Sequence, residues 1–411
     1  MLKVDKEKLL KSERFCMIPW VHLHGSISGN VKPCCRSDND SSIGNLKDNT
    51  LEELWNSSSL RQIRLNMLNG SKSDSCRKCY ELESTGAITL RQDSLKNFAQ
   101  YFNVVETTQP DGTVEDMNLK YLDLRFSNVC NFKCRSCGPF SSSRWHSDML
   151  KIRPDKFKNQ TAIIRPTEDP EVLWRQLEGI VSGLDEIYFA GGEPLIMEEH
   201  YRILKILDDK NLHHVRLRYN TNFSEMKFKG QDVMEIWKNF QDVNVGASLD
   251  GSYARGEYIR KEQDWSRTVE NRENMIKICP EVEFFISATI SLMNVHHIPD
   301  FHKEWYELGL IGIDDFHTNI LLFPDHLRTQ VLPRYMKDRI TQKFSEYEDY
   351  LSSNNSDKTI ILFRSIIKFM NQQDMSSGLP KLRQFMGILD RIRDEDFLRT
   401  FPELENLFDE I

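Results

Sequence analysis

Six short apolar runs in the middle of the chain alternate with stretches of helical periodicity. Stretches such as Glu171–Ser182 and Tyr201–Asp209 repeat apolar residues with the period of a helix. Repeated strand–helix units predict a parallel sheet, because each crossover returns the chain to the same edge. The pattern allows an open doubly wound sheet or a partial barrel, and both bind ligands at the carboxyl ends of their strands. The predicted strands are Leu119–Ser127, Glu186–Ala190, His214–Asn220, Val243–Leu249, Glu283–Ile290 and Phe316–Leu322.

The first ninety residues follow a different pattern. His22–His24 and Val31–Pro33 flank a run rich in Ser, Gly and Asn, which predicts a β-hairpin. Thr50 and Glu53 form a capping box that predicts a helix ending at Gly70. A Pro-Asp-Gly turn predicts the next boundary. We divide the chain into an N-terminal cysteine-rich module with its linker (1–106), an α/β region (113–330) and a helical C-terminal extension whose role no motif indicates (331–411).

Composition narrows the class of protein. The 411 residues are 39% hydrophobic and 28% charged, which is typical of a globular protein. No apolar run approaches the roughly 20 residues that a membrane-spanning helix needs, and the N-terminus lacks the apolar stretch of a secretory signal. We therefore expect a cytoplasmic protein without a membrane partner. The net charge of −8 argues against nucleic acid as a partner.

The nine cysteines are clustered along the chain. Five lie in the first 80 residues, three form a group at Cys130, Cys134 and Cys137, and Cys279 stands alone. In a cytosolic chain, clustered cysteines bind metal or do chemistry more often than they form disulfides. The group of three follows the first predicted strand, and its thiolates can bind one soft metal centre. Three ligands leave a position open for substrate or cofactor, whereas a distant fourth cysteine would complete a structural site.

The spacing Cys130-x3-Cys134-x2-Cys137 after the first strand resembles the cluster loop of radical S-adenosylmethionine (SAM) enzymes. The resemblance implies a partial (β/α)6 TIM-like barrel in which the three cysteines hold a [4Fe–4S] cluster, with SAM on the fourth iron. It also implies that reductive cleavage of SAM gives a 5′-deoxyadenosyl radical, which abstracts a hydrogen atom from the substrate. Ser136 departs from the family pattern, which has an aromatic residue there, and Phe132 is the nearest aromatic residue.

The second predicted strand ends in Gly191-Gly192-Glu193-Pro194. Two glycines let the backbone approach a ligand closely, and a carboxylate can accept hydrogen bonds from an ammonium group. A Gly-Gly turn after a strand is by itself usually only a turn. One strand after the three-cysteine loop, however, it resembles the Gly-Gly-Glu-Pro motif of radical SAM enzymes. The resemblance implies that Glu193 binds the amino group of SAM.

Two further strand ends resemble motifs of the same family. Asn222 lies in a sequence similar to the family's Thr-Asn-Gly, with Phe223 in place of the glycine. The fourth strand ends in Ser-Leu-Asp-Gly, which implies that Ser248 and Asp250 lie near the SAM ribose. The resemblance also implies that Arg260 pairs with the methionine carboxylate, and an arginine fork suits a carboxylate. The segment before Arg260 departs from the family's His-Asp, and each of these residues alone also suits a turn, a cap or a surface charge.

The N-terminal module resembles SPASM or twitch domains, which hold an auxiliary iron–sulfur cluster. The resemblance rests on a Phe-Cys16-x2-Pro-Trp segment, a Pro-Cys34-Cys35 segment and Cys76-x2-Cys79. It implies a second [4Fe–4S] cluster on Cys16, Cys34, Cys76 and Cys79, and a structural zinc on the same thiolates is the alternative. Cys34 is preferred to Cys35 because it directly follows the proline at the strand end. In most relatives this module follows the radical domain, whereas here it comes first.

Together these resemblances imply a radical SAM enzyme that modifies a peptide or protein side chain. A small molecule, such as a sugar or nucleotide derivative, is the alternative substrate. An electron donor such as flavodoxin or ferredoxin would reduce the cluster. A non-enzymatic zinc or iron–sulfur scaffold and a two-cluster electron-transfer protein stay open, but neither explains the motifs at successive strand ends. No residue is predicted as a catalytic acid, base or hydrogen donor.

Overall fold

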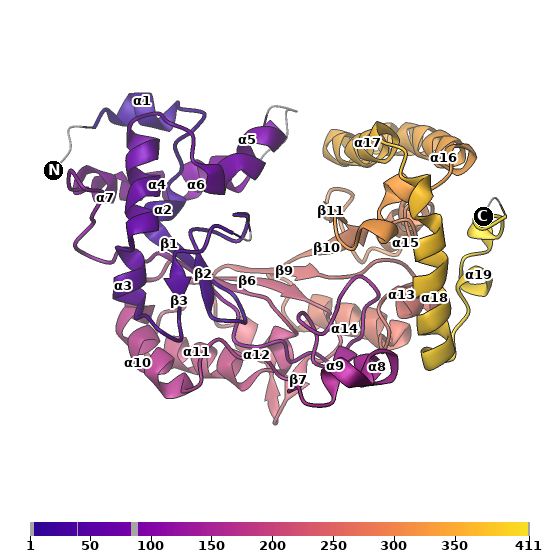
Figure 1. Cartoon of the computed structure of the whole chain (residues 1–411), viewed down its shortest axis with the longest axis horizontal. Helices are drawn as coiled ribbons and strands as arrows, with labels where there is room; N and C mark the ends of the chain where they lie inside the picture. Colours follow the sequence, from indigo (N-terminus) through magenta and orange to yellow (C-terminus); the bar gives the residue numbers. More distant parts are fainter. Residues whose placement is uncertain (1–3, 39, 84–88, 410–411) are drawn as a thin grey trace.

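The computed structural model describes residues 4–38, 40–83 and 89–409 and is built on a nine-stranded sheet (Figure 1). The strands of the sheet are β1 His22–Gly25, β2 Asn30–Lys32, β3 Gly44–Asn45, β4 Tyr121–Leu124, β5 Glu186–Phe189, β6 Arg216–Thr221, β9 Val243–Ala247, β10 Glu283–Ile290 and β11 Phe316–Ile320. Their spatial order is β11-β10-β9-β6-β5-β4-β1-β2-β3. A separate hairpin joins β7 Lys227–Phe228 to β8 Gln231–Asp232.

The six predicted strands are β4, β5, β6, β9, β10 and β11, and they pair with one another in parallel. They are neighbours in the same order as in the sequence, so every crossover moves one strand in the same direction. A doubly wound sheet would reverse that direction at a switch point. The fold is therefore a partial (β/α)6 barrel, with a helical C-terminal region, as the resemblance implied.

The N-terminal module continues the sheet of the barrel. Its first strand β1 pairs in parallel with β4, with His22 opposite Tyr121 and His24 opposite Asp123. The predicted hairpin is confirmed, since β2 and β3 add to β1 in antiparallel order. The predicted capping box is also present, but the single predicted helix is two helices, α3 Leu51–Trp55 and α4 Ser58–Leu68. The chain breaks between them because the Ser57 side chain accepts from Leu60 N and caps a new helix.

The two faces of the sheet have different chemistry. Apolar side chains at alternate strand positions point to the helices below the sheet in Figure 1, where Phe189 contacts His200 at 4.7 Å and Tyr219 contacts Trp237 at 5.2 Å between ring centroids. The intervening positions lie on the opposite face, because strand side chains alternate. Most of them are polar or charged, with Phe285 of β10 as an apolar member. The covering helices are α10 Pro170–Ile180, α11 Glu198–Asp209, α12 Val233–Trp237 and α14 Trp265–Ile278.

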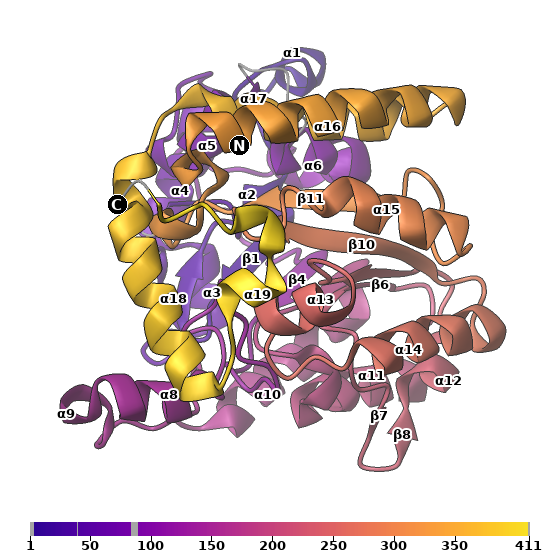
Figure 2. The same cartoon turned by 90° about the vertical axis from the view of Figure 1, so that its right-hand side faces the viewer.

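The C-terminal extension is helical, as predicted, and packs against the barrel. Figure 2 shows α16 and α17 beside α15, while α18 runs down to α8 and α19 lies by α13. These elements are α8 Trp145–Ile152, α13 Tyr253–Ile259, α15 Ile298–Glu307, α16 Arg334–Ser353, α17 Asp357–Gln372, α18 Leu379–Arg393 and α19 Phe397–Thr400. The remaining helices are α1 Lys6–Leu10, α2 Ile18–Val21, α5 Arg77–Glu83, α6 Leu90–Phe98, α7 Phe102–Glu106 and α9 Pro154–Phe157. Within the described ranges, no helix is both long and apolar enough to cross a membrane.

Candidate active site

The loop that holds Cys130, Cys134 and Cys137 leaves the carboxyl end of β4, and we call residues 130–137 the cysteine loop. Its turn is closed by Cys137 N, which donates to the carbonyl of Cys134 at 3.0 Å. The thiol of Cys137 hydrogen-bonds to Cys134, which lowers the pKa of Cys134 and raises that of Cys137. Burial and the nearby Cys134 raise the pKa of Cys130 to about 12. The three thiols therefore lie together, as the spacing predicted.

The Gly-Gly-Glu-Pro turn after β5 packs on Val129, the residue directly before the cysteine loop. Gly191 and Gly192 have φ of +84° and +56°, in the left-handed region that favours glycine. A Cβ atom on Gly192 would lie 2.2 Å from the carbonyl oxygen of Val129. Glu193 N donates to that same carbonyl at 2.7 Å, and Pro194 begins a short 3-10 turn. A side chain at Gly192 would therefore push the turn away from Val129, and one at Gly191 would meet the side chain of Arg125.

The Glu193 carboxylate lies at the centre of these strand ends and is 1% exposed. It accepts from Leu195 N at 3.0 Å, from Thr221 Oγ1 at 2.7 Å and from Asn222 N at 2.6 Å. Burial raises the pKa of Glu193 to about 7 despite these bonds. A carboxylate with this environment changes charge near neutral pH, and it gains from a positively charged partner.

Asn222, after β6, holds the cysteine loop in place. Its Nδ2 donates to Asn131 Oδ1 at 2.7 Å, and Asn131 Nδ2 in turn donates to Ser224 Oγ at 2.9 Å. Phe223, which replaces the family's glycine, has φ of +58°. Its buried ring packs on Phe284 at 5.1 Å between centroids, a contact that offsets the backbone cost.

Arg260 and Asp250 form a buried bidentate pair beside the cysteine loop. Arg260 Nε and Nη2 lie 2.8 Å and 2.9 Å from the two carboxylate oxygens of Asp250. Arg260 Nη1 lies 3.9 Å from Cys134 Sγ, so the guanidinium spans the carboxylate and the thiol. Asp250 also accepts from Thr289 N at 2.7 Å, and Ser248 N donates to the Thr221 carbonyl at the same distance.

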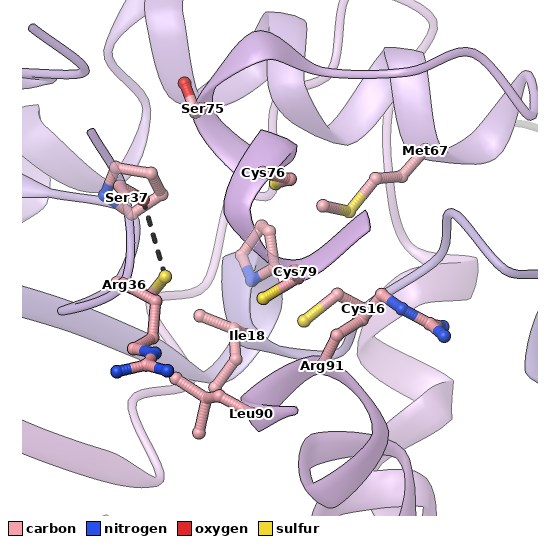
Figure 3. Close-up of a pocket in the computed structure, with 13 residues that line it drawn as sticks. Cys16, Ile18, Arg36, Ser37, Met67, Ser75, Cys76, Cys79, Leu90 and Arg91 are labelled. Atoms are coloured by element: carbon pink, nitrogen blue, oxygen red, sulfur yellow. Dashed lines mark hydrogen bonds between the residues drawn. The ribbon is translucent and has the colours of Figure 1, made fainter. Parts of the chain in front are cut away.

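Four cysteines of the N-terminal module line one pocket (Figure 3). They are Cys16, Cys34, Cys76 and Cys79. The sulfurs of Cys16 and Cys79 point toward each other, and Cys34 Sγ is 3.4 Å from the hydroxyl of Ser37. The other lining residues are mostly apolar and include Ile18, Met67 and Leu90.

Cys35 lies outside this pocket. Burial and the nearby carboxylate of Asp123 raise the pKa of Cys35 to about 12. Its thiol therefore lies on the side of Asp123 and Arg125, toward the barrel. The structure separates the two adjacent cysteines, which the sequence could distinguish only by the preceding proline.

The chemistry of both cysteine sets fits iron–sulfur clusters. Burial raises the pKa of Cys16 to about 12 and raises that of Cys76 further, with added repulsion from neighbouring thiols. Such thiols become thiolates only when a cation binds them. In the described part of the chain, no three His, Cys, Asp or Glu side chains are placed to hold a single metal ion. A [4Fe–4S] cluster makes a different demand, because each thiolate binds its own iron atom.

Charged and aromatic residues on the second face of the sheet were not predicted as site residues. Tyr188 lies between two guanidinium groups, with Arg125 at 4.8 Å and Arg218 at 5.7 Å from its ring centroid. Asp123 pairs with Arg125 at 2.8 Å, and Glu186 pairs with Arg218 at 3.0 Å. We call these five residues the polar face. Their signal in the sequence is charge or tyrosine at every second position of three predicted strands.

Comparison with known proteins identifies two families. Residues 124–307 match the family model of the radical SAM superfamily, and residues 16–80 match the SPASM iron–sulfur cluster-binding domain. No curated protein has significant sequence similarity. The chain is similar to native anSMEcpe with bound AdoMet (19% identity, TM-score 0.39, 57% of this chain, 62% of that one). It is also similar to Streptococcus suis SuiB bound to precursor peptide SuiA (14% identity, TM-score 0.37, 73% of this chain, 64% of that one). It thus spans less than two thirds of either structure.

Proposed function

Since the chain is a radical SAM enzyme with an N-terminal SPASM iron–sulfur domain, we propose that it uses SAM to modify a peptide or protein side chain. The radical cluster is assigned to Cys130, Cys134 and Cys137. The observation that carries this assignment is a pair of hydrogen bonds: the end of β5 bonds to Val129, directly before the cysteine loop, and the end of β6 bonds to Asn131 within it. When bound, a reduced [4Fe–4S] cluster supplies the electron that breaks a carbon–sulfur bond of SAM.

The residues around the cysteine loop would orient SAM. Glu193 is the proposed ligand of the amino group, because a buried carboxylate with a raised pKa gains from an ammonium. Arg260 is the proposed partner of the methionine carboxylate, and Asp250 holds its guanidinium in a fixed orientation. Gly192 keeps the turn against Val129 and Gly191 lies against Arg125. Asn222 and Ser248 border the same strand ends.

The polar face supports a peptide or protein substrate. It offers paired charges of both signs around an aromatic ring, and the Arg218 side chain keeps 40% of its surface exposed. A peptide presents backbone hydrogen-bonding groups and charged side chains that suit such a face, and the N-terminal module borders it through β1. A small polar molecule, such as a sugar or nucleotide derivative, is the second candidate, since the same charges can bind it.

The four-cysteine pocket is the proposed site of an auxiliary [4Fe–4S] cluster. Its thiols sit among apolar side chains, an environment that shields iron–sulfur bonds from water. In this proposal a flavodoxin or ferredoxin reduces the enzyme in the cytoplasm. Strand β1 of the module pairs directly with β4, which carries Asp123 of the polar face and leads into the cysteine loop.

The raised pKa of Glu193 predicts that the affinity for SAM decreases as the pH is lowered. The ionised carboxylate binds the ammonium, so affinity is full above the pKa of about 7 and is lost as pH decreases through it. Between pH 7.5 and 6.0 we expect the dissociation constant, measured calorimetrically with oxidised enzyme, to rise about 8-fold. Glu193→Gln should bind SAM weakly and with a flat profile. A wild-type affinity that is constant over this range would remove Glu193 as the ammonium ligand.

The direct test is anaerobic reconstitution with iron and sulfide, followed by dithionite and SAM. We expect 5′-deoxyadenosine and about eight irons per chain, the content of two [4Fe–4S] clusters. A colourless, zinc-loaded protein that leaves SAM intact would instead favour a scaffold function. Peptide and small-molecule substrates are then separated by whether deuterium from a labelled peptide library enters 5′-deoxyadenosine.

A further inference from the structure

Arg135 lies between two of the three loop cysteines, and its side chain is fully buried at 0% exposure. Its guanidinium stacks on the ring of Tyr258, 3.6 Å from the centroid, and Nε donates to the Tyr258 carbonyl at 3.2 Å. The backbone N of Arg135 also donates to the carbonyl of Ile259 at 2.8 Å. The cysteine loop is therefore anchored to α13, next to Arg260.

The counter-charges for Arg135 come from the C-terminal extension. Its Nη2 lies 2.6 Å from Asp390, on α18, and 2.7 Å from Glu395, just after that helix. Asp390 also accepts from the Tyr258 hydroxyl at 2.7 Å and from Phe397 N at 2.9 Å. Asp390 is thus held in position by its own bonds, and Glu395 also pairs with Lys261 at 3.2 Å. We call Arg135, Asp390 and Glu395 the loop triad.

A second ion pair joins the extension to the helix that follows the loop. Arg393, also on α18, lies 2.8 Å from Asp148 on α8, and both side chains are buried. Lys133 in the loop contacts the same Asp148 at 3.2 Å. Trp145 Nε1 donates to the carbonyl of Cys134 at 2.9 Å, and the Arg393 guanidinium lies 4.7 Å from its ring centroid. The extension therefore contacts Arg135, which follows Cys134, and Asp148, which pairs with Lys133 on the other side of Cys134.

Burial of a guanidinium is unfavourable unless carboxylates pair with it. Arg135 has no other carboxylate partner in the described part of the chain, so its inward position depends on Asp390 and Glu395. Without them the side chain gains by turning out to water, and this movement displaces Cys134 and Cys137 on either side of it.

We infer that the C-terminal extension positions the catalytic cysteine loop, with Arg135 as the positioning residue through which it acts. The inference rests on the proposed assignment of Cys130, Cys134 and Cys137 as the radical cluster ligands. No motif in the extension indicated this contact with the cysteine loop. The inference gives the extension a role in SAM cleavage. The wild-type enzyme must first produce 5′-deoxyadenosine, and failure there would count against the proposed function alone.

The test is the Asp390→Asn/Glu395→Gln variant of the full chain, with Glu405→Gln as the matched control. Glu405 is an exposed carboxylate of the same extension outside the triad. Before reconstitution, we expect amide exchange at residues 133–137 to be about 10-fold faster in the double variant, because a local opening becomes easier. After reconstitution, the electron paramagnetic resonance spectrum of the reduced, SAM-bound radical cluster should shift or split, and kcat for SAM cleavage should fall about 10-fold.

Glu395→Asp keeps the charge, so its amide exchange, spectrum and kcat should stay close to those of the wild type. If the double variant fails to fold, Arg135→Gln gives the same test from the loop side and leaves the extension intact. Exchange and spectrum identical to wild type in a folded variant would overturn the inference. So would equal changes in the Glu405→Gln control, since those would reflect general destabilisation of the extension.

Discussion

Replacing Cys130, Cys134 and Cys137 with Ala should abolish SAM cleavage and leave the second cluster in place. We expect 5′-deoxyadenosine formation to fall by more than about 10³-fold, the scale seen when the group on which the chemical step depends is lost. About four irons per chain should stay bound, because the four-cysteine pocket shares no ligand with the cysteine loop. Anaerobic iron analysis and an assay for 5′-deoxyadenosine measure both quantities on one sample.

Cys279→Ala is the matched control for this triple variant. Cys279 is buried at the end of α14, where its N–H caps the helix by donating to the Met275 carbonyl at 2.9 Å. It is a thiol of the same chain outside both cysteine sets, so SAM cleavage and iron content should stay at wild-type levels. Continued SAM cleavage by the triple variant would refute the assignment, and loss of all its iron would contradict two independent clusters.

The barrel was predictable because its signals are local. Strand β10 has the predicted bounds, since alternation and strand-forming residues run through the whole segment. Strand β4 is shorter than predicted and ends at Leu124, opposite Gly25, where its partner β1 also ends. The helix predicted to end at Gly70 was interrupted by a serine cap, a signal as local as the one that opened it.

Other features depend on contacts that no local pattern contains. The parallel pairing of β1 with β4 joins residues about 100 positions apart, so the sequence alone did not reveal that the N-terminal module extends the barrel sheet. Arg135 reads as an ordinary loop charge, because the carboxylates that bury it lie more than 250 positions away. The alternating charges of the polar face were available as a signal, since Asp123 and Arg125 alternate with the apolar Leu122, Leu124 and Phe126.

Replacing Cys76 and Cys79 with Ala should have the opposite selectivity to the loop variant. Both residues lie in one helical turn, Cys76 at the end of a 3-10 turn and Cys79 in α5, so the double variant removes two of the four thiolates from one side of the pocket. We expect iron to fall from about eight to about four per chain, because two remaining thiolates cannot retain a [4Fe–4S] cluster. SAM cleavage should continue at a comparable rate, because the bonds that hold the cysteine loop are unchanged.

Cys35→Ala is the sharpest control for this variant, because Cys35 is adjacent in sequence to a proposed ligand and lies outside the pocket. Its thiol faces Asp123 and Arg125, so its loss should leave the iron content at about eight per chain. If Cys35→Ala lost four irons and Cys34→Ala retained all of its iron, Cys35 and not Cys34 would be the cluster ligand. Loss of SAM cleavage in Cys76→Ala/Cys79→Ala would mean that the module also supports the radical site. The pairing of β1 with β4 provides a direct structural connection for such an effect.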